Sequence, residues 1–237
     1  MDSETLRIGR SNNVFVLVAL LAGLLPLAGI NIAYFLSVDA ELVPRCIPYL
    51  QGCTSISATG RHPPGSVVYR GTVIPSACFM LLYWYFASQW LAAHGNKSLR
   101  GRMLPWLGLC AAIFLVTFVA ALGEVGDGYR TQRRLGMIGY VSSTFFAQLF
   151  FIGSIAKSKR SGELIFPAWV WRTKLALLAG MVILGLGSLF TPLFTSDLKA
   201  AEQIIEWNFF LLSASFFTVT GFAWYKDRIG ADFSIRG

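Results

Sequence analysis

Charged residues, histidine and cysteine are scarce in this sequence, and their scarcity excludes several classes of protein. Only 14% of the 237 residues are charged, whereas a soluble domain normally carries about a quarter. The mean hydropathy is +0.59, which is too apolar for a water-soluble protein. The formal net charge of +8 is not spread as a basic patch interleaved with aromatic residues on a soluble module, so we predict no nucleic-acid partner.

The two histidines argue against a metal enzyme. His62 precedes and His94 follows the apolar run of residues 71–93, so a membrane-spanning helix would separate them. Catalytic zinc sites need clustered ligands, and we therefore predict neither a metal nor a cofactor. The chain also lacks a Gly-x-Ser-x-Gly nucleophile elbow. No recognisable catalytic constellation remains, and the sequence leaves open whether the protein is an enzyme.

The sequence does contain six apolar runs, each long enough to cross a bilayer, which takes roughly 20 residues. A backbone inside a bilayer must satisfy its own hydrogen bonds, so each run is predicted to be a helix. No run contains lysine or arginine. We predict an all-α integral membrane protein, one six-helix bundle over residues 1–237. The runs cover residues 14–36, 71–93, 105–123, 135–156, 175–194 and 206–225.

The basic residues indicate how such a bundle would be oriented. With six spans, the side that holds both termini carries 13 basic and five acidic residues, and the other side carries seven of each. Because cytoplasmic loops are enriched in lysine and arginine, both termini are predicted to be cytoplasmic. The long first loop, residues 37–70, is then extracytoplasmic. The membrane would be that of the Golgi, the endoplasmic reticulum or the cell surface in a eukaryote, and the inner membrane in a bacterium.

Cys46 and Cys53 lie in this first loop, and Asn96-Lys97-Ser98 lies on the predicted cytoplasmic side. An oxidising compartment would permit a disulfide between the two cysteines, but their spacing does not require one. The Asn-Lys-Ser sequence matches a glycosylation acceptor by pattern, although its predicted location is cytoplasmic.

An acidic rim follows the predicted spans on the extracytoplasmic side. Glu124 and Asp127 follow the third span, and Glu202 and Glu206 lie one helical turn apart before and at the start of the sixth. Ionisable groups at membrane depth are functional candidates. The alternative for Glu206 is an interfacial acid stabilised by a helix N-terminus. Polar residues inside the spans more often join helices than line a channel; they include Asn31, Ser142, Ser143, Thr144, Gln148, Ser213 and Ser215.

The first loop and the start of the last span resemble a known family of membrane proteins. The matching positions are Cys46, Pro48, Tyr49, Leu50, Ser55, Ser57, Gly60, Pro64, Tyr69 and Arg70, followed by Glu206-Trp207. This pattern is similar to the family of the damage-regulated autophagy modulators, the FGF-receptor-activating protein and the amino-terminal domain of the Cwh protein. Among its members, the chain is most similar to the Golgi factor that remodels the lipid of GPI anchors.

The resemblance implies a six-helix protein that handles or modulates lipid through its extracytoplasmic face. Arg70 would meet a headgroup phosphate, and the carboxylates would meet amine or sugar hydroxyl groups of anionic lipids or glycolipids. The family often has a histidine where Gln132 stands, so no catalytic role is carried over. The binding candidates are Tyr49, Ser55, Ser57, Arg70, Glu124, Asp127 and Glu206. The alternative is a non-enzymatic regulator that recruits partners through its tail or through residues 157–174.

Overall fold

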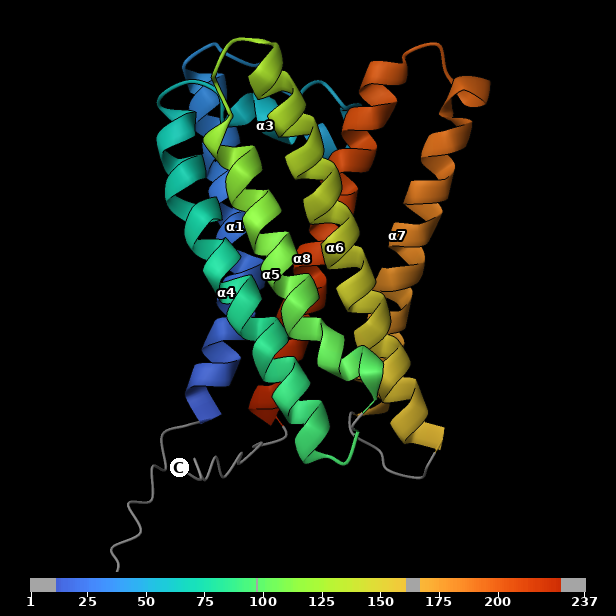
Figure 1. Ribbon diagram of the computed structural model, residues 1–237. Helices are drawn as coiled ribbons and strands as arrows, with labels where there is room; N and C mark the ends of the chain where they lie inside the picture. The colour runs from blue at the N-terminus through green and yellow to red at the C-terminus, as the bar shows by residue number, and fades with distance from the viewer. Residues whose placement is uncertain (1–11, 97, 161–166, 227–237) are drawn as a thin grey trace, which may run out of the picture.

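The computed structural model describes residues 12–96, 98–160 and 167–226, and every regular element within them is a helix. Six helices are long and apolar enough to cross a membrane, as predicted. Successive long helices run in opposite directions, so the start of α1 and the end of α8 lie at the same end of the bundle (Figure 1). The helices are α1 (Asn12–Asp39), α2 (Pro48–Gln51), α3 (Ile56–Thr59), α4 (Gly65–Ala93), α5 (Leu99–Ala120), α6 (Asp127–Arg160), α7 (Ala168–Phe194) and α8 (Leu198–Lys226).

The long helices begin before the apolar runs that predicted them. α6 begins at Asp127 and α8 at Leu198, each eight residues ahead of its run. Hydropathy marks the part of a helix that lies in hydrocarbon, whereas helical hydrogen bonding continues into the polar interface. In contrast, α5 ends at Ala120, before the predicted residue 123. Gly123 has φ +86, a left-handed conformation that a helix cannot continue through.

The predicted loop of residues 157–174 is largely helical as well. α6 continues to Arg160 and α7 begins at Ala168, while residues 161–166 lie outside the described part of the chain. Lys174 is therefore part of α7, and its side chain is fully buried. Lysine is almost never buried to this extent.

Large aromatic side chains join α4 to its neighbours in the centre of the bundle. Tyr83 and Trp84 are fully buried, and their ring centroids lie 4.8 and 5.6 Å from that of Phe217 on α8. The Tyr83 hydroxyl lies 2.7 Å from Thr220 Oγ1. Helices in a bilayer associate through such close packing and interhelical hydrogen bonds rather than through the hydrophobic effect. These contacts position the helices that surround the cavity described below.

α7 packs chiefly against α8 and lies at the margin of the bundle (Figure 1). Much of its surface is apolar and exposed, for example Leu189 at 71% and Leu193 at 76%. Lys174 connects it to α8, because its Nζ donates to the Phe216 carbonyl at 2.8 Å. The same Nζ lies 3.5 Å from the centroid of the Phe216 ring, which is a cation–π contact.

The turn between α4 and α5 is fixed by Asn96. Its Nδ2 donates to the Ser154 carbonyl at 2.7 Å and to Ser158 Oγ at 2.9 Å, both on α6. Its Oδ1 accepts from the Ser98 backbone N–H at 3.1 Å. The Asn96 side chain thus attaches this turn to α6.

Candidate functional site

Residues 46–60, which we call the cap, cover one end of the bundle. The cap contains α2 and α3, which contact α1, α4 and α8. A disulfide joins Cys46 to Cys53, with their Cα atoms 6.5 Å apart. Gly52 ends α2 with φ +56, and a Cβ at this position would collide with the backbone of Ala200 on α8. The backbone geometry here therefore requires glycine.

Glu206 connects α8 to the start of α3. Its carboxylate accepts hydrogen bonds from the backbone N–H groups of Ile56 and Ser57, and Arg61 lies close enough to interact electrostatically. The first N–H groups of a helix have no partner within that helix, so a carboxylate placed there is stabilised. Glu206 was predicted to open the last span, but α8 begins at Leu198 and Glu206 lies two turns inside it. The helix N-terminus that it contacts is that of α3.

Trp207 anchors the cap from the adjacent position. The indole is fully buried, and its Nε1 donates to the Thr54 carbonyl at 2.8 Å. Its ring centroid lies 5.0 Å from that of Tyr49 in an edge-on arrangement. Edge-on aromatic pairs contribute about 0.5–1.5 kcal/mol beyond the area that they bury. Glu206 and Trp207 thus contact the same short segment of the cap.

Tyr49 holds α2 against α1. Its hydroxyl accepts from Asn31 Nδ2 at 3.0 Å and donates to Asn31 Oδ1 at 3.2 Å. Burial raises the pKa of the Tyr49 phenol above its ordinary value, and the hydrogen bond from Asn31 only partly offsets this. The phenol therefore stays protonated at neutral pH. The main-chain carbonyl of Tyr49 also accepts a hydrogen bond from Asn208 Nδ2 at 2.8 Å.

Beneath the cap lies a cavity of about 260 Å³, which we call the bundle cavity. Its walls come from α1, α3, α4, α5, α6 and α8 and are mostly apolar. From Tyr69 to Met80, two lining residues of α4, the helix rises about 16 Å, so the cavity is elongated along the bundle. Its polar lining residues are Tyr69, Tyr140, Thr144, Glu202, Glu206 and Ser213.

The bundle cavity reaches the side of the bundle between α6 and α8. Met137 and Val141 on α6 line the cavity and are partly exposed, as are Ile205 and Phe209 on α8. These two helices make few contacts with each other. The cavity therefore has Glu206 at the cap end and an apolar edge at the surface that would face lipid.

Ser55, Ser57 and Arg70 make local contacts in the structure. Ser55 Oγ accepts from the Ala58 backbone N–H at 3.2 Å and so caps α3, and Ser57 Oγ lies 3.1 Å from it. Arg70 Nη2 donates to the Leu122 carbonyl, which fixes α4 to the end of α5. Arg70 is not among the residues that line the bundle cavity.

Glu124 and Asp127 lie in a separate surface depression of about 440 Å³ at the cap end. Arg61, His62 and Arg130 also line it. Arg133, a further lining residue, donates to the carbonyls of Ala121 and Glu124 at 3.0 and 2.8 Å. The depression is lined by acidic and basic side chains, most of them exposed. It shares no lining residue with the bundle cavity.

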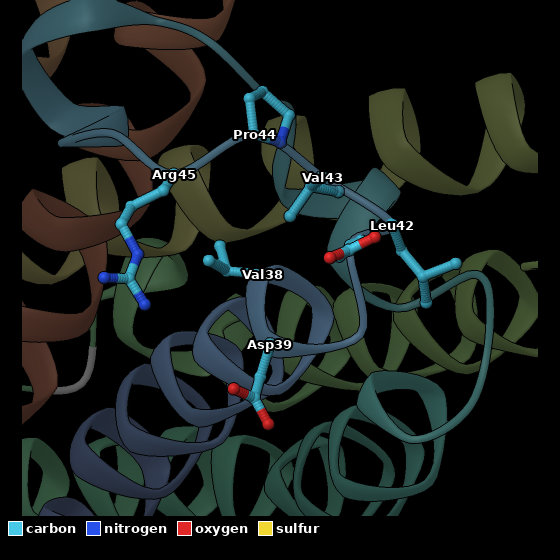
Figure 2. Close-up of a pocket in the computed structure, with 7 residues that line it drawn as sticks. Val38, Asp39, Leu42, Val43, Pro44 and Arg45 are labelled. Atoms are coloured by element: carbon cyan, nitrogen blue, oxygen red, sulfur yellow. The ribbon is translucent and has the colours of Figure 1, made fainter.

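A third depression, of about 530 Å³, lies where the chain leaves α1 (Figure 2). Figure 2 shows Asp39 and Arg45 among the apolar side chains of Val38, Leu42 and Val43. Among the described residues, the lining comes from the end of α1 and the segment that follows it.

The sequence candidates thus divide into three groups. Tyr49, Ser55, Ser57 and Glu206 meet at the cap, Arg70 braces α4 against α5, and Glu124 and Asp127 share the separate depression. In the ranges 12–96, 98–160 and 167–226, no three His, Cys, Asp or Glu side chains are grouped for metal binding. The tail proposed for partner recruitment, residues 227–237, lies outside the described residues.

Sequence reasoning did not identify the polar lining residues of the bundle cavity other than Glu202 and Glu206. Tyr69 was predicted only through the family resemblance, and no sequence pattern indicated Tyr140. Thr144 and Ser213 were assigned to helix packing, but both line the cavity. The signal that could have found them is their clustering one to two turns from other polar residues on α6 and α8. Comparison with family models, curated proteins and solved structures finds no match for this chain.

Proposed function

We propose that this chain is a multi-pass membrane protein whose cap lies outside the cytoplasm. Its six helices of membrane length support this proposal. Arg100 and Arg102 at the start of α5, and Lys157 near the end of α6, lie at the end opposite the cap. Lysine and arginine accumulate on the cytoplasmic side of membrane proteins, so both termini would lie in the cytoplasm.

Labelling of single cysteines in intact cells tests this orientation. Val125 is 92% exposed in the turn between α5 and α6, and Val125→Cys should react with a membrane-impermeant maleimide. Lys157→Cys should react only after the membrane is made permeable. The reverse pattern would contradict the proposed orientation.

Within this orientation, we propose that the protein binds the acyl chain of a membrane lipid in the bundle cavity. The strongest support for acyl-chain binding is the shape and lining of the bundle cavity. It is elongated and apolar, with a carboxylate at its cap end and an apolar edge between α6 and α8. Pockets for apolar ligands combine such walls with a few placed polar groups. A chain entering from the bilayer would pass between α6 and α8 and leave its headgroup near Glu202 and Glu206.

Photo-crosslinking tests acyl-chain binding directly. The purified protein would be reconstituted in bilayers that contain a phosphatidylcholine with a diazirine in one acyl chain, and the labelled peptides would be identified by mass spectrometry. We expect label on cavity residues of α6 and α8, such as Val141 and Phe209.

Filling the cavity should remove this label. Val141→Trp places a large side chain inside the cavity, whereas the matched control Val182→Trp places one on an exposed face of α7. We expect the cavity label to fall at least about tenfold in the first variant and to persist in the second. Label confined to the outer faces of α7 in the unaltered protein would refute acyl-chain binding.

We further propose membership in the family that includes the GPI-anchor remodelling factor, with lipid remodelling as the physiological role. The support is that residues carrying the resemblance contact one another. Tyr49 packs on Trp207, and Gly60 has no room for a Cβ because the Tyr69 ring lies against it. Tyr49 and Gly60 belong to the cap, and Tyr69 and Glu206 line the bundle cavity beneath it.

The remodelling role can be tested in eukaryotic cells that lack the protein. Complementation with the unaltered chain, with Glu206→Ala and with the control Glu124→Ala would be followed by analysis of GPI-anchor lipids. We expect the first and third to restore the lipid composition and Glu206→Ala to fail. Unchanged lipid in the null cells and in Glu206→Ala cells would refute the role while leaving acyl-chain binding intact.

A further inference from the structure

The cap end of the bundle cavity carries a net negative charge. Glu202 and Glu206 both line the cavity and lie one turn apart on α8, so their side chains share one face of that helix. None of the described residues that line the cavity is basic. Arg61 interacts electrostatically with Glu206 from outside this lining. Two carboxylates therefore meet one nearby guanidinium, and the difference can be balanced by a cationic ligand.

A buried phenol at the same end of the cavity has no hydrogen-bond partner. Tyr69 on α4 is 2% exposed and lines the cavity, and among the described residues its hydroxyl makes no hydrogen bond. It lies close enough to Glu206 for an electrostatic interaction. The other phenol of the cavity, that of Tyr140, is hydrogen-bonded to the Thr144 side chain. Because buried polar groups are nearly always hydrogen-bonded, the Tyr69 hydroxyl indicates that a ligand group binds here.

These three side chains determine which headgroup can bind at the cap end. A carboxylate only accepts hydrogen bonds, and a phenol oxygen can accept one as well. An ammonium has three N–H donors and a positive charge, so it can donate to Glu202, Glu206 and Tyr69 while balancing the net charge. A phosphate or a carboxylate in the same place would be repelled by both glutamates.

Below the cap end, the bundle cavity suits one plain hydrocarbon chain. Its volume of about 260 Å³ lies below the roughly 300–1,000 Å³ of pockets for drug-sized ligands, which favours one chain over two. The deeper polar side chains are already engaged, since Thr144 is bonded to Tyr140. Ser213 Oγ accepts from Gln148 Nε2 at 3.0 Å. A chain whose only polar group is its head therefore matches this lining.

Resting on the proposed function, we infer that the preferred ligand of the bundle cavity is a single-chain lipid with a primary amine directly on its chain, and that its ammonium binds between Glu202, Glu206 and Tyr69. Sphingoid bases have this chemistry. The hydrocarbon chain occupies the apolar part of the cavity, which it enters from the bilayer between α6 and α8. Glu202 and Tyr69 are thereby assigned as headgroup-binding residues beside Glu206.

Three photoreactive probes test the inference on the intact protein in phosphatidylcholine nanodiscs. They share one hydrocarbon chain that carries a diazirine, and they differ only in the head, which is a primary amine, a hydroxyl or a carboxylate. Label on Val141 and Phe209 is divided by label on the exposed face of α7 around Val182, which corrects for unequal partition into the bilayer. We expect the corrected label of the amine to exceed that of the alcohol about 10-fold, and that of the carboxylate to fall below both.

Variants locate the preference for the amine. Glu202→Gln and Tyr69→Phe each remove one partner of the ammonium and should lower the preference about 2- to 5-fold. Glu206→Gln should lower it further, although this change also affects the contact with α3. Glu124→Gln is the matched control, because Glu124 is an acid at the same end of the bundle that lines a separate depression. We expect the preference to be unchanged in this control.

The outcomes separate this inference from the proposed function. Equal corrected label from the amine and the alcohol, both removed in Val141→Trp, would overturn the inference and leave acyl-chain binding standing. Absence of cavity label from all three probes and from the phosphatidylcholine probe would overturn both. A preference that survives in Glu202→Gln and Tyr69→Phe would overturn the inference, because the ammonium would then lie elsewhere. A loss in Glu124→Gln as large as that in Glu202→Gln would overturn it too, since the general surface charge would then explain the preference.

Discussion

Replacing Glu206 with leucine should release α3 from the bundle. The carboxylate accepts two backbone N–H groups, those of Ile56 and Ser57, and leucine offers no acceptor. Hydrogen bonds to charged groups contribute about 1.5–3 kcal/mol each. Burial of the carboxylate opposes these hydrogen bonds, and water can replace part of them because Glu206 is only partly buried. We therefore take about 2–4 kcal/mol as the cost of opening the cap locally.

Hydrogen exchange measures this cost at the site itself. At about 1.4 kcal/mol per factor of ten, the exchange of the Ile56 and Ser57 amides should accelerate about 30- to 1,000-fold in Glu206→Leu. Glu206→Gln keeps one carbonyl acceptor and should show a smaller acceleration. Glu202→Leu is the matched control, since Glu202 lies one turn earlier on α8 and is exposed.

The result that would refute this reasoning is unchanged exchange over residues 56–59 in Glu206→Leu. The cap would then be held by the Trp207 hydrogen bond and the Cys46–Cys53 disulfide, with the carboxylate contributing nothing measurable. Acceleration of equal size in Glu202→Leu would refute it differently, because it would show a general loosening of α8.

Three further substitutions test other contacts. Trp207→Phe keeps an aromatic ring but is smaller than the buried indole and leaves the Thr54 carbonyl without its donor, and thermal melting in detergent should show a loss of at least about 1–3 kcal/mol. Lys174→Met should raise the stability by about 1–2 kcal/mol, because a buried amine, which among the described residues contacts the Phe216 carbonyl and the Phe151 and Phe216 rings, is replaced by an apolar side chain; a loss would contradict this. Gly52→Ala should destabilise the cap by at least about 1–2 kcal/mol, since its φ is +56, and faster hydrogen exchange over residues 46–60 would detect this.

The sequence allowed the helical class and the six long helices to be predicted, because uninterrupted apolar runs of membrane length leave the backbone few alternatives. The ends of the helices could not be predicted in the same way. Residues 127–134 are polar and yet continue α6, since their side chains reach the interface while the backbone remains helical. The buried position of Lys174 had no sequence signal, because a basic residue beside an apolar run ordinarily marks its end.

The candidate site was only partly accessible to sequence reasoning. Glu206 stood out as an acid beside a long apolar run, and the structure places it at the cap end of the bundle cavity. Tyr49 and Ser55 were predicted as binding residues of the first loop. In the structure, the Tyr49 side chain fixes α2 against α1 and the Ser55 side chain caps α3. Thr144 was assigned to helix packing, because Ser142 and Ser143 beside it are polar as well and the sequence does not indicate which of these hydroxyls faces a cavity.

The burial of Asn96 has a practical consequence for mapping this protein. A carbohydrate can be attached to an Asn-x-Ser sequence only through the side-chain amide, and this amide is engaged with the Ser154 carbonyl and Ser158 Oγ. In the folded protein the amide of the natural sequon is therefore not accessible to a glycosylating enzyme, whichever side of the membrane it faces. An acceptor sequence introduced at the exposed Val125 would instead report the side of the membrane on which the turn between α5 and α6 resides.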